Sequence, residues 1–422
     1  ASSRAARTEK RGEGLSGSED DRIGLARRLT LLHAVLYGVG VTIGAGIYVL
    51  VGVAAGRSGM HAPLGFLAAA VAMGLSAASF AELGTRMPVS ASEAAYVDAA
   101  FHRRWLTLAM GLLVIATAIV SAATISVGSV SYIGVFLPVP PKLIIIGVLL
   151  VLGVIASLAT TQSVGFAGAM TIIEVAGLGL IIAAGLAQGS ELFVRLPELV
   201  PSADNQAAWL SLGSTTLIAV FAFIGFEHVV NIAEELKNPS RSLPWALFLT
   251  LAITALLYML VVWIAVVAVP PAELAGSPAP LALVFQRLTG LPLISMSAIA
   301  IVATLNGIVV HMIMIARVIY GLARQGNLPR SLGRVSSVTR TPLTATALAV
   351  MAILFLALAV PLEGLADLAS RGTLAVFAGI NLALIRIKTR KDAAPPGAFN
   401  CPLWVSYAGL ASSLLLLAAS LL

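Results

Sequence analysis

Two carboxylates lie in stretches of the sequence that are otherwise almost entirely apolar. Glu174 stands near the centre of the run 165–187, and Glu227 stands in the run 209–233, next to His228. An ionised carboxylate at the middle of a bilayer costs at least ~2.5 kcal/mol, so acidic residues at such depth are candidates for function. A carboxyl group whose ionisation is opposed by burial takes up and releases a proton near neutral pH. Glu174 is therefore a candidate proton carrier.

Glu227 has two alternative roles. As a pocket residue it would favour a cationic side chain such as that of lysine, arginine or ornithine. As a cap it would accept hydrogen bonds from backbone N–H groups at the start of a helix, where a carboxylate is stabilising. The sequence leaves both roles open.

Glycines interrupt two of the apolar runs at the same depth. The stretch AVLYGVGVTIGAGIYVLVGVAAG, residues 34–56, holds Gly44-Ala45-Gly46 at its centre, and Gly225 lies in mid-run two residues before Glu227. Each glycine costs a helix roughly 1 kcal/mol relative to alanine, so a helix that only had to span would use fewer. Close helix packing accounts for Gly38, Gly40 and Gly52. For the central triplet we favour ligand contact, because the second run repeats the feature.

An interrupted helix offers its own backbone to a ligand. Breaking a helix at its midpoint frees N–H groups that attract an anion and C=O groups that attract a cation. A zwitterion such as an amino acid presents both charges. Interrupted backbone at membrane depth is tolerated where it lines a cavity or is buried in protein.

The elements that must position these groups are membrane-spanning helices. The chain of 422 residues is 59% hydrophobic and 11% charged, against roughly 25% charged residues in soluble domains, and a span needs about 20 apolar residues. We expect an all-α polytopic membrane protein with about eleven spans, the two interrupted runs being the first and the sixth. The apolar runs lie near 31–55, 63–84, 105–137, 142–159, 165–187, 209–233, 243–269, 288–323, 343–361, 365–386 and 402–422.

The basic residues predict the orientation of these spans. With a cytoplasmic N-terminus, the alternation places all Lys and Arg residues on the inner side except Arg57, Lys142, Arg195, Arg287 and Arg371. We expect an integral protein of the cell (inner) membrane in the lipid bilayer. The formal net charge of +7 then reflects topology, so no nucleic-acid partner is expected.

Two interrupted runs five spans apart predict two inverted repeats. We expect a cytoplasmic basic tail over 1–29 without fixed structure, a first repeat over 30–187 and a second over 188–390 that begins with an outer loop at 188–208. A last loop and span follow over 391–422. The single cysteine, Cys401, forms no internal disulfide, and no Cys/His cluster has metal-ligand spacing.

Four motifs resemble the amino acid–polyamine–organocation (APC) superfamily of transporters, bacterial-type amino acid permeases in particular. The resemblance runs from about residue 25 to 391. It implies the leucine-transporter-like 5+5 fold with helices 1 and 6 broken. The motifs are IGAGIYVL at 43–50, PVSASEAAYVDAAF at 88–101, FAFIGFEHVVNIAEELKNPSRSLP at 221–244 and IARVIYGLARQGNLP at 315–329.

The resemblance also implies where an amino acid binds. Its carboxylate lies against N–H groups of the first break, and its ammonium faces carbonyls of the sixth helix, with Gly225 permitting that break. One of Phe221 and Phe223 would cap the site. The implied carboxylate residues are Ile43, Gly44, Ala45, Gly46 and Ile47, and the implied ammonium residues are Phe221, Ala222, Phe223 and Ile224.

The coupling ion is expected to be a proton, with no cofactor and no metal. Proton-driven relatives often carry a lysine near the position of Glu174, so this chain departs from their pattern. Glu174 has two alternative roles: a protonated carboxyl bonded to a carbonyl of the first helix, or a sodium ligand. Sodium is less favoured, because Ser295, Ser297 and Thr304 of the eighth run provide no two adjacent hydroxyls.

Other functions are less favoured by the sequence. No His-Glu-x-x-His or Gly-x-Ser-x-Gly-like motif indicates an enzyme. A divalent-metal transporter of this fold would carry a carboxylate in the first break, where TIGAGIY has none. We therefore expect a secondary active amino acid transporter, a proton symporter. An amino acid or polyamine exchanger and an amino acid sensor remain alternatives, and the sequence does not predict the substrate or the oligomeric state.

Overall fold

The computed structural model describes residues 29–89, 92–158, 164–189, 191–324, 326–339 and 341–420. Within these ranges the chain forms helices joined by short connections, and the only β-type pairing there is one isolated bridge. The predicted N-terminal tail lies outside the described residues up to residue 28. The boundaries proposed for the two repeats stay predictions.

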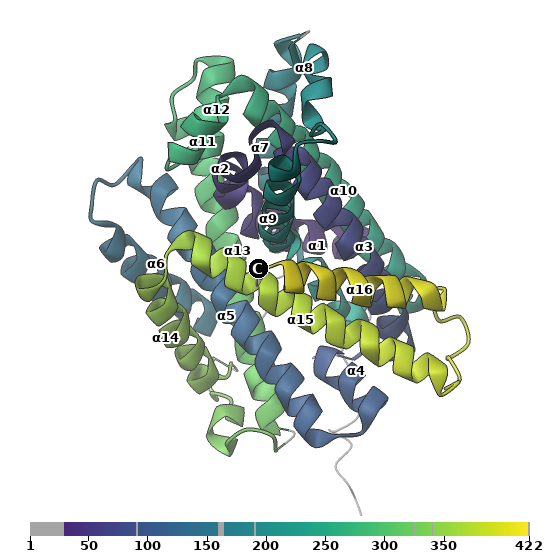
Figure 1. Cartoon of the computed structure of the whole chain (residues 1–422). Coiled ribbons are helices and arrows are strands. Elements are labelled where there is room, and N and C mark those ends of the chain that lie inside the picture. The colour runs from purple at the N-terminus through teal and green to yellow at the C-terminus, as the bar shows by residue number, and fades with distance from the viewer. Residues whose placement is uncertain are drawn as a thin grey trace, which may run out of the picture.

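Each of the eleven apolar runs coincides with a helix or a pair of helix halves (Figure 1). The first run forms α1 and α2, and the sixth forms α9 and the 3-10 helix η4. The helices that follow the runs are α1 (Leu31–Ala45), α2 (Ile47–Ser58), α3 (Ala62–Arg86), α5 (Arg104–Gly134), α6 (Pro141–Leu158), α7 (Val164–Ala187), α9 (Gln206–Phe223), η4 (Phe226–Glu235), α10 (Pro239–Ala268), α13 (Ile294–Arg324), α14 (Leu343–Ala359), α15 (Leu362–Thr389) and α16 (Leu403–Ala419).

Short helices cap the two ends of the bundle. At the end drawn uppermost in Figure 1 lie α8 (Glu191–Val194), α11 (Pro271–Gly276) and α12 (Pro280–Thr289), and at the opposite end lies α4 (Ser92–Phe101). We call the end with α4 the basic end, because Arg86, Arg104 and Lys388 lie near it. Three short 3-10 turns complete the described elements: η2 (Gly59–His61), η3 (Leu196–Leu199) and η5 (Arg330–Gly333).

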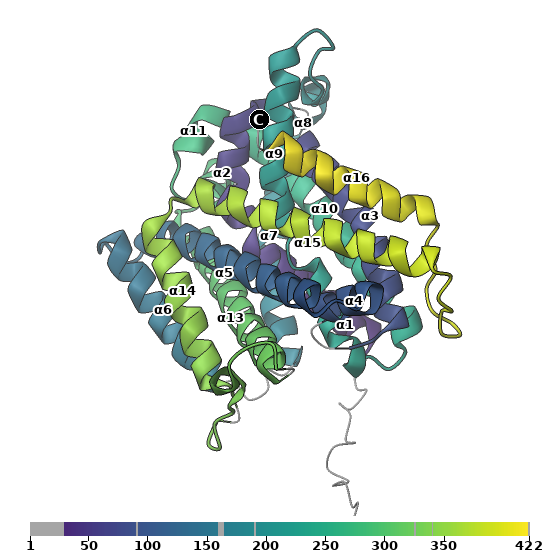
Figure 2. The ribbon, with the colours of Figure 1, turned by 60° about the horizontal axis from the view of Figure 1, so that its bottom comes forward.

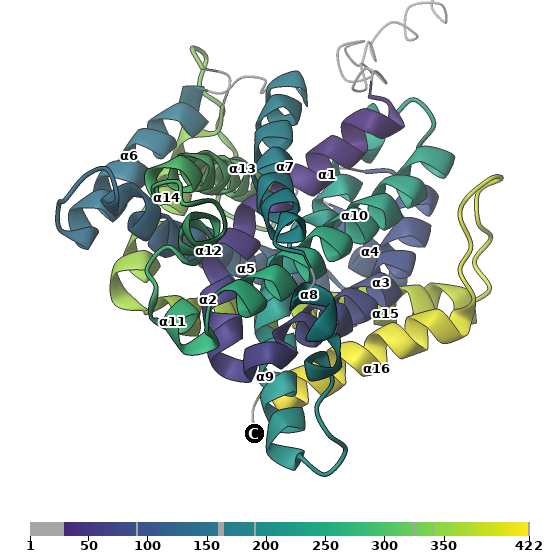
Figure 3. The ribbon, with the colours of Figure 1, turned by 90° about the horizontal axis from the view of Figure 1, so that it is seen from above.

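The long helices form two groups that Figure 3 shows on opposite sides of the bundle. In one group, α3 packs against α9 and α10, and α10 packs against α1. In the other, α5 and α13 pack together with α6 and α14. Between the groups, α7 contacts α1, α10 and α13, while α15 packs against both α16 and α5 (Figure 2). The broken helices therefore lie at the centre of the molecule.

The outward faces of the peripheral helices are apolar. Val151 and Val154 of α6 and Met351 and Phe355 of α14 are each more than half exposed. A soluble protein rarely shows such a continuous apolar surface. Eight described helical segments are long and apolar enough to cross a membrane, and α1, α14 and α16 are shorter apolar helices. The expectation of an integral membrane protein is confirmed.

Both expected helix breaks are present, and each has a different form. α1 ends at Ala45 and α2 begins at Ile47, so Gly46 alone separates them. α9 ends at Phe223, and Gly225 then adopts a φ of +122° before η4 begins. This left-handed conformation favours glycine strongly, because a Cβ clashes there.

One backbone pairing joins the two broken helices at the basic end. The Leu29 N–H donates to the Glu235 carbonyl at 2.9 Å, and the Lys237 N–H donates to the Leu29 carbonyl at 3.0 Å. Leu29 precedes α1, and Leu236, its partner in this parallel bridge, follows η4. The start of α1 and the end of η4 are thus tied to each other.

Candidate functional site

The two breaks face each other across direct backbone contact. A Cβ on Gly46 would lie 2.2 Å from the Ala222 Cα, and a Cβ on Gly225 would lie 3.0 Å from the backbone of Val41. Only glycine allows chains to approach this closely. The breaks of the first and sixth helices are therefore packed against one another at the centre of the bundle.

Tyr258 of α10 connects the two breaks through its hydroxyl. The Oη atom lies 2.9 Å from the Thr42 carbonyl and 3.0 Å from the Ala222 carbonyl, and the side chain is fully buried. One hydroxyl proton serves both acceptors, which belong to α1 and α9. Sequence reasoning missed Tyr258, whose only signal was a tyrosine within the run 243–269.

The predicted binding residues are brought together but are not equally accessible. Ile43, Ile47 and the segment 221–223 are completely buried. The Phe221 carbonyl accepts from the Ile224 N–H, and the Ala222 carbonyl accepts from Tyr258. Of the residues predicted at the breaks, Ile224 and Glu227 line a cavity on the side of the basic end. The assignment of the others to a substrate stays a prediction.

Glu227 contacts the backbone that the sixth-helix break leaves free. Its Oε2 atom accepts a hydrogen bond from the Gly225 N–H at 2.9 Å. Its Oε1 atom lies 3.9 Å from the Nε2 atom of His228. The carboxylate thus caps the start of η4, while its second oxygen is directed toward the imidazole. Its contact with a substrate stays a prediction.

The cavity beside Glu227 measures about 30 Å³ and lies between η4, α5, α13, α15 and α4. We call it the inner cavity. His228 and His311, distant in sequence, meet there with ring centroids 5.5 Å apart. The residues that line the inner cavity are Glu93, Val114, Thr117, Ala118, Ser121, Ile224, Glu227, His228, His311, Met314, Thr373, Val376 and Phe377.

A larger cavity of about 390 Å³ lies toward the opposite end. We call it the outer cavity. It is bounded by α2, α5, the segment 275–280 and the start of α15. Tyr48 and Tyr132 line it, and the Tyr132 hydroxyl donates to the Tyr48 carbonyl. The two cavities lie on opposite sides of the packed breaks.

Glu174 is completely buried in α7 next to α13. Its Oε1 atom accepts a hydrogen bond from the Asn306 side-chain amide at 3.0 Å, while its Oε2 atom has no hydrogen-bond partner. The contacts between α7 and the first helix run elsewhere: Thr171 donates to the Leu36 carbonyl, and Tyr48 donates to the backbone carbonyl of Glu174. Sequence reasoning missed Asn306, a polar residue inside the run 288–323.

Comparison with known proteins identifies the family of this chain. The sequence profile of the amino acid permease family matches residues 29–422. The chain belongs to the amino acid permease family. This confirms the resemblance to the APC superfamily.

Several curated proteins are similar to the permease along most of its length. The branched-chain amino acid permease BcaP of Bacillus subtilis is 29% identical over 90% of this chain and 84% of its own. Cationic amino acid transporter 2, vacuolar, of Arabidopsis thaliana is 30% identical over 86% of this chain. Cationic amino acid transporter 3, mitochondrial, of the same plant is 30% identical over 88% of this chain. The permease spans 60% and 64% of these two plant proteins.

A solved structure supports the fold. The manganese transporter of Eremococcus coleocola has a TM-score of 0.63 and 14% sequence identity, covering 93% of this chain and 86% of its own. The expected leucine-transporter-like fold is confirmed by this likeness, which concerns the fold alone. In the described part of the permease, no three His, Cys, Asp or Glu residues group closely enough to hold a metal ion.

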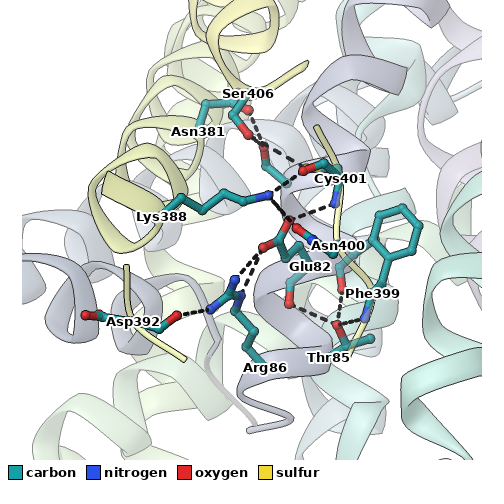
Figure 4. A network of polar contacts seen from close by, with 12 residues as sticks. Glu82, Thr85, Arg86, Asn381, Lys388, Asp392, Phe399, Asn400, Cys401 and Ser406 are labelled. Carbon is teal, nitrogen blue, oxygen red and sulfur yellow. Dashed lines mark hydrogen bonds and ion pairs between the residues drawn. The ribbon is translucent and has the colours of Figure 1, made fainter. Parts of the chain in front are cut away.

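A polar network at the basic end was not singled out from the sequence (Figure 4). Glu82 of α3 is completely buried and accepts from Arg86 at 2.7 Å, from Lys388 at 2.7 Å and from the Cys401 N–H at 2.9 Å. Lys388 also donates to Asn400 at 2.8 Å. We call this set the Glu82 network. It fixes the segment between α15 and α16 onto α3.

Proposed function

We propose that this permease is a secondary active amino acid transporter that works by alternating access, with its basic end in the cytoplasm. The observation that carries the proposal is the pair of helix breaks meeting at the bundle centre, between the inner and outer cavities. The packed breaks close the centre of the bundle, and a cavity lies on each side of them. This arrangement suits a substrate site that is exposed to one side of the membrane at a time. Membership in the amino acid permease family supports the substrate class.

The broken helices supply opposite partial charges for a zwitterion. The first N–H groups of α2, from Ile47 onward, lie at a helix N-terminus and favour the substrate carboxylate. The last carbonyls of α9, at Phe221, Ala222 and Phe223, lie at a helix C-terminus and favour the ammonium. Binding then requires the Gly46 and Ala222 backbones to separate. In this proposal the substrate replaces the direct contact between the breaks.

Glu174 carries the coupling proton in this proposal. Its Oε2 atom is buried without a partner, and a protonated carboxyl is favoured over an ionised one in such a site. Tyr48 of α2 donates to the backbone carbonyl of Glu174, and Thr171, also of α7, donates to the Leu36 carbonyl of α1. Both halves of the first helix therefore contact α7 near this carboxyl, so a change in its charge can act on the first break. Proton symport follows if uptake of substrate accompanies proton transfer at this carboxyl.

Counterflow of radiolabelled amino acids in proteoliposomes tests transport itself. Accumulation of label against unlabelled internal substrate is expected. Binding seen as a rise in the thermal midpoint without counterflow would instead indicate a sensor. Absence of both for all proteinogenic amino acids and polyamines would contradict the proposal.

A Glu174→Gln variant tests the coupling. Glutamine keeps an oxygen that accepts from Asn306 but cannot carry the proton, so we expect counterflow to persist while uptake driven by a pH gradient is lost. The exposed Glu198, paired with Arg195 at the far end, gives the control variant Glu198→Gln with unchanged uptake. Undiminished gradient-dependent uptake by Glu174→Gln would rule out the proton role.

A further inference from the structure

The inner cavity contains an unusual concentration of polar atoms without partners. Five side-chain atoms that line it are buried and make no hydrogen bond in the described structure. Each of the five side chains is more than nine-tenths buried. Native proteins pair nearly all buried polar groups, so a cluster of unpaired ones calls for an explanation. The five atoms are Thr117 Oγ1, Ser121 Oγ, His228 Nδ1, His311 Nε2 and Thr373 Oγ1.

The unpaired atoms can mostly accept hydrogen bonds. The His311 Nδ1 atom lies 2.8 Å from the Gly307 carbonyl, which only accepts, so Nδ1 carries the proton. In the neutral ring the Nε2 atom then presents a lone pair to the cavity. The His228 Nδ1 atom is buried without a partner, and the Nε2 atom lies 3.9 Å from the Glu227 Oε1 atom. A neutral ring with its proton on Nε2, on the side of the carboxylate, leaves Nδ1 as an acceptor. The hydroxyls of Thr117, Ser121 and Thr373 supply further acceptors.

The charges around the cavity have one sign. Glu93 and Glu227 both line it, and no Lys or Arg is among its lining residues. The Gly225 N–H donates to the Oε2 atom of Glu227 and does not bind its Oε1 atom. A ligand that brings N–H donors and a positive charge suits the two imidazole nitrogens, the hydroxyl oxygens and the two carboxyl groups. A branched aliphatic side chain would leave all five atoms unpaired.

The size of the cavity further restricts which chemical groups fit into it. A volume of about 30 Å³ matches one or two groups of the size of water, at roughly 10–15 Å³ each. A primary ammonium has this size and three donors, whereas a guanidinium is a larger planar fork. The cavity adjoins the break through Ile224 and Glu227, where the proposed function places the α-ammonium of the substrate.

We propose that the inner cavity receives the side-chain ammonium of a basic amino acid, so that the transported class is lysine-like rather than branched aliphatic. This inference rests on the proposed transport function. The three N–H groups of the ammonium donate to acceptors drawn from Thr117, Ser121, Thr373 and the two imidazoles, and Glu227 balances its charge. The substrate spans from the helix breaks, which hold its α-carboxylate and α-ammonium, into the inner cavity.

Competition in proteoliposomes separates this inference from the proposed function. Labelled lysine, ornithine, arginine and leucine are tested for counterflow, and lysine and ornithine are expected to exchange at least tenfold more efficiently than leucine. Exchange of leucine but not of lysine or ornithine would overturn the inference and leave amino acid transport standing. If neither these four compounds nor any other amino acid is exchanged, transport itself is overturned.

A double variant, Ser121→Ala with Thr373→Val, tests the residues. Both hydroxyls are unpaired, so their removal should leave the thermal midpoint without substrate unchanged or higher. The Kd for lysine should rise about tenfold or more, as expected for lost bonds to a charged group. The control Thr254→Val removes a buried hydroxyl of α10 that bonds to its own helix, at Thr250. Unchanged lysine affinity in the double variant would place the ammonium elsewhere and overturn the inference.

Discussion

Glu82 and Glu227 are both buried carboxylates, and their surroundings are opposite. Glu82 accepts hydrogen bonds from Arg86, Lys388 and the Cys401 backbone. Glu227 has no Lys or Arg among the residues that line the inner cavity, and it shares that cavity with five unpaired polar atoms. One carboxylate is fully neutralised by fixed partners, and the other faces groups that still have bonding capacity.

In our proposal the difference separates a structural site from a binding site. A buried ion pair with all its hydrogen bonds made fixes one arrangement of the chain, and it has nothing left to offer a ligand. Unpaired buried groups lower the stability of the empty protein, which is tolerated where a ligand restores the bonds. The cluster of unmade hydrogen bonds beside Glu227 therefore supports the proposed binding site.

Removal of the Glu82 carboxylate should have the largest effect on stability. In Glu82→Ala, Lys388 and Arg86 lose a buried counter-charge, and the free energy of unfolding is expected to fall by about 3–5 kcal/mol. Thermal unfolding in detergent measures the change. The exposed Glu198 provides the comparison, and Glu198→Ala should leave the thermal midpoint close to that of the parent protein. Equal effects of the two variants would contradict the structural role of the Glu82 network.

Gly225→Ala should have the next largest effect. It acts next to Glu227, the second carboxylate of the comparison. A Cβ there meets Val41 at 2.8 Å in a backbone with φ of +122°, so a loss of about 1–3 kcal/mol and of transport is expected. Gly213 in α9 has open space around its Cα, and Gly213→Ala should instead stabilise the protein by about 0.4–1 kcal/mol. A neutral Gly225→Ala would show that the break does not need glycine.

The thiol of Cys401 reports on the Glu82 network without disturbing it. Burial, reinforced by the hydrogen bond to Glu82, raises the pKa of this thiol to about 11. Because the thiolate is the reactive form, alkylation should be slow at pH 8 and keep accelerating up to about pH 11. The rate of iodoacetamide labelling against pH measures this, and Cys401 is the single cysteine of the chain. A profile that levels off near pH 8.5 would show that the thiol is exposed and the network open.

The positions of the helices and of the two helix breaks could be predicted from the sequence. The eleven apolar runs predicted the helices to within a few residues, because span length is set by the bilayer. Gly44, Gly46 and Gly225 predicted the two breaks, because clustered glycines weaken a helix wherever they occur. The form of the second break was not predicted: η4 is a 3-10 helix rather than an α-helix.

Residues that act through distant partners could not be identified from the sequence. Thr117, Ser121 and Thr373 look like the small polar residues that pack between membrane helices, and only the fold brings them to one cavity. Glu82 stands near the end of its apolar run, where a charge usually meets water. Its burial depends on Lys388 and Cys401, which lie more than three hundred residues away.

The pairing of Leu29 with the chain around Leu236 has a mechanical consequence. The two backbone hydrogen bonds resist sliding of the segment at Leu29 past the segment at Leu236. The half-helices α1 and η4 are therefore connected to each other at the basic end. Two half-helices without such a connection could each move alone to open a path. In our proposal the two half-helices therefore move together at the basic end when the breaks at Gly46 and Gly225 separate.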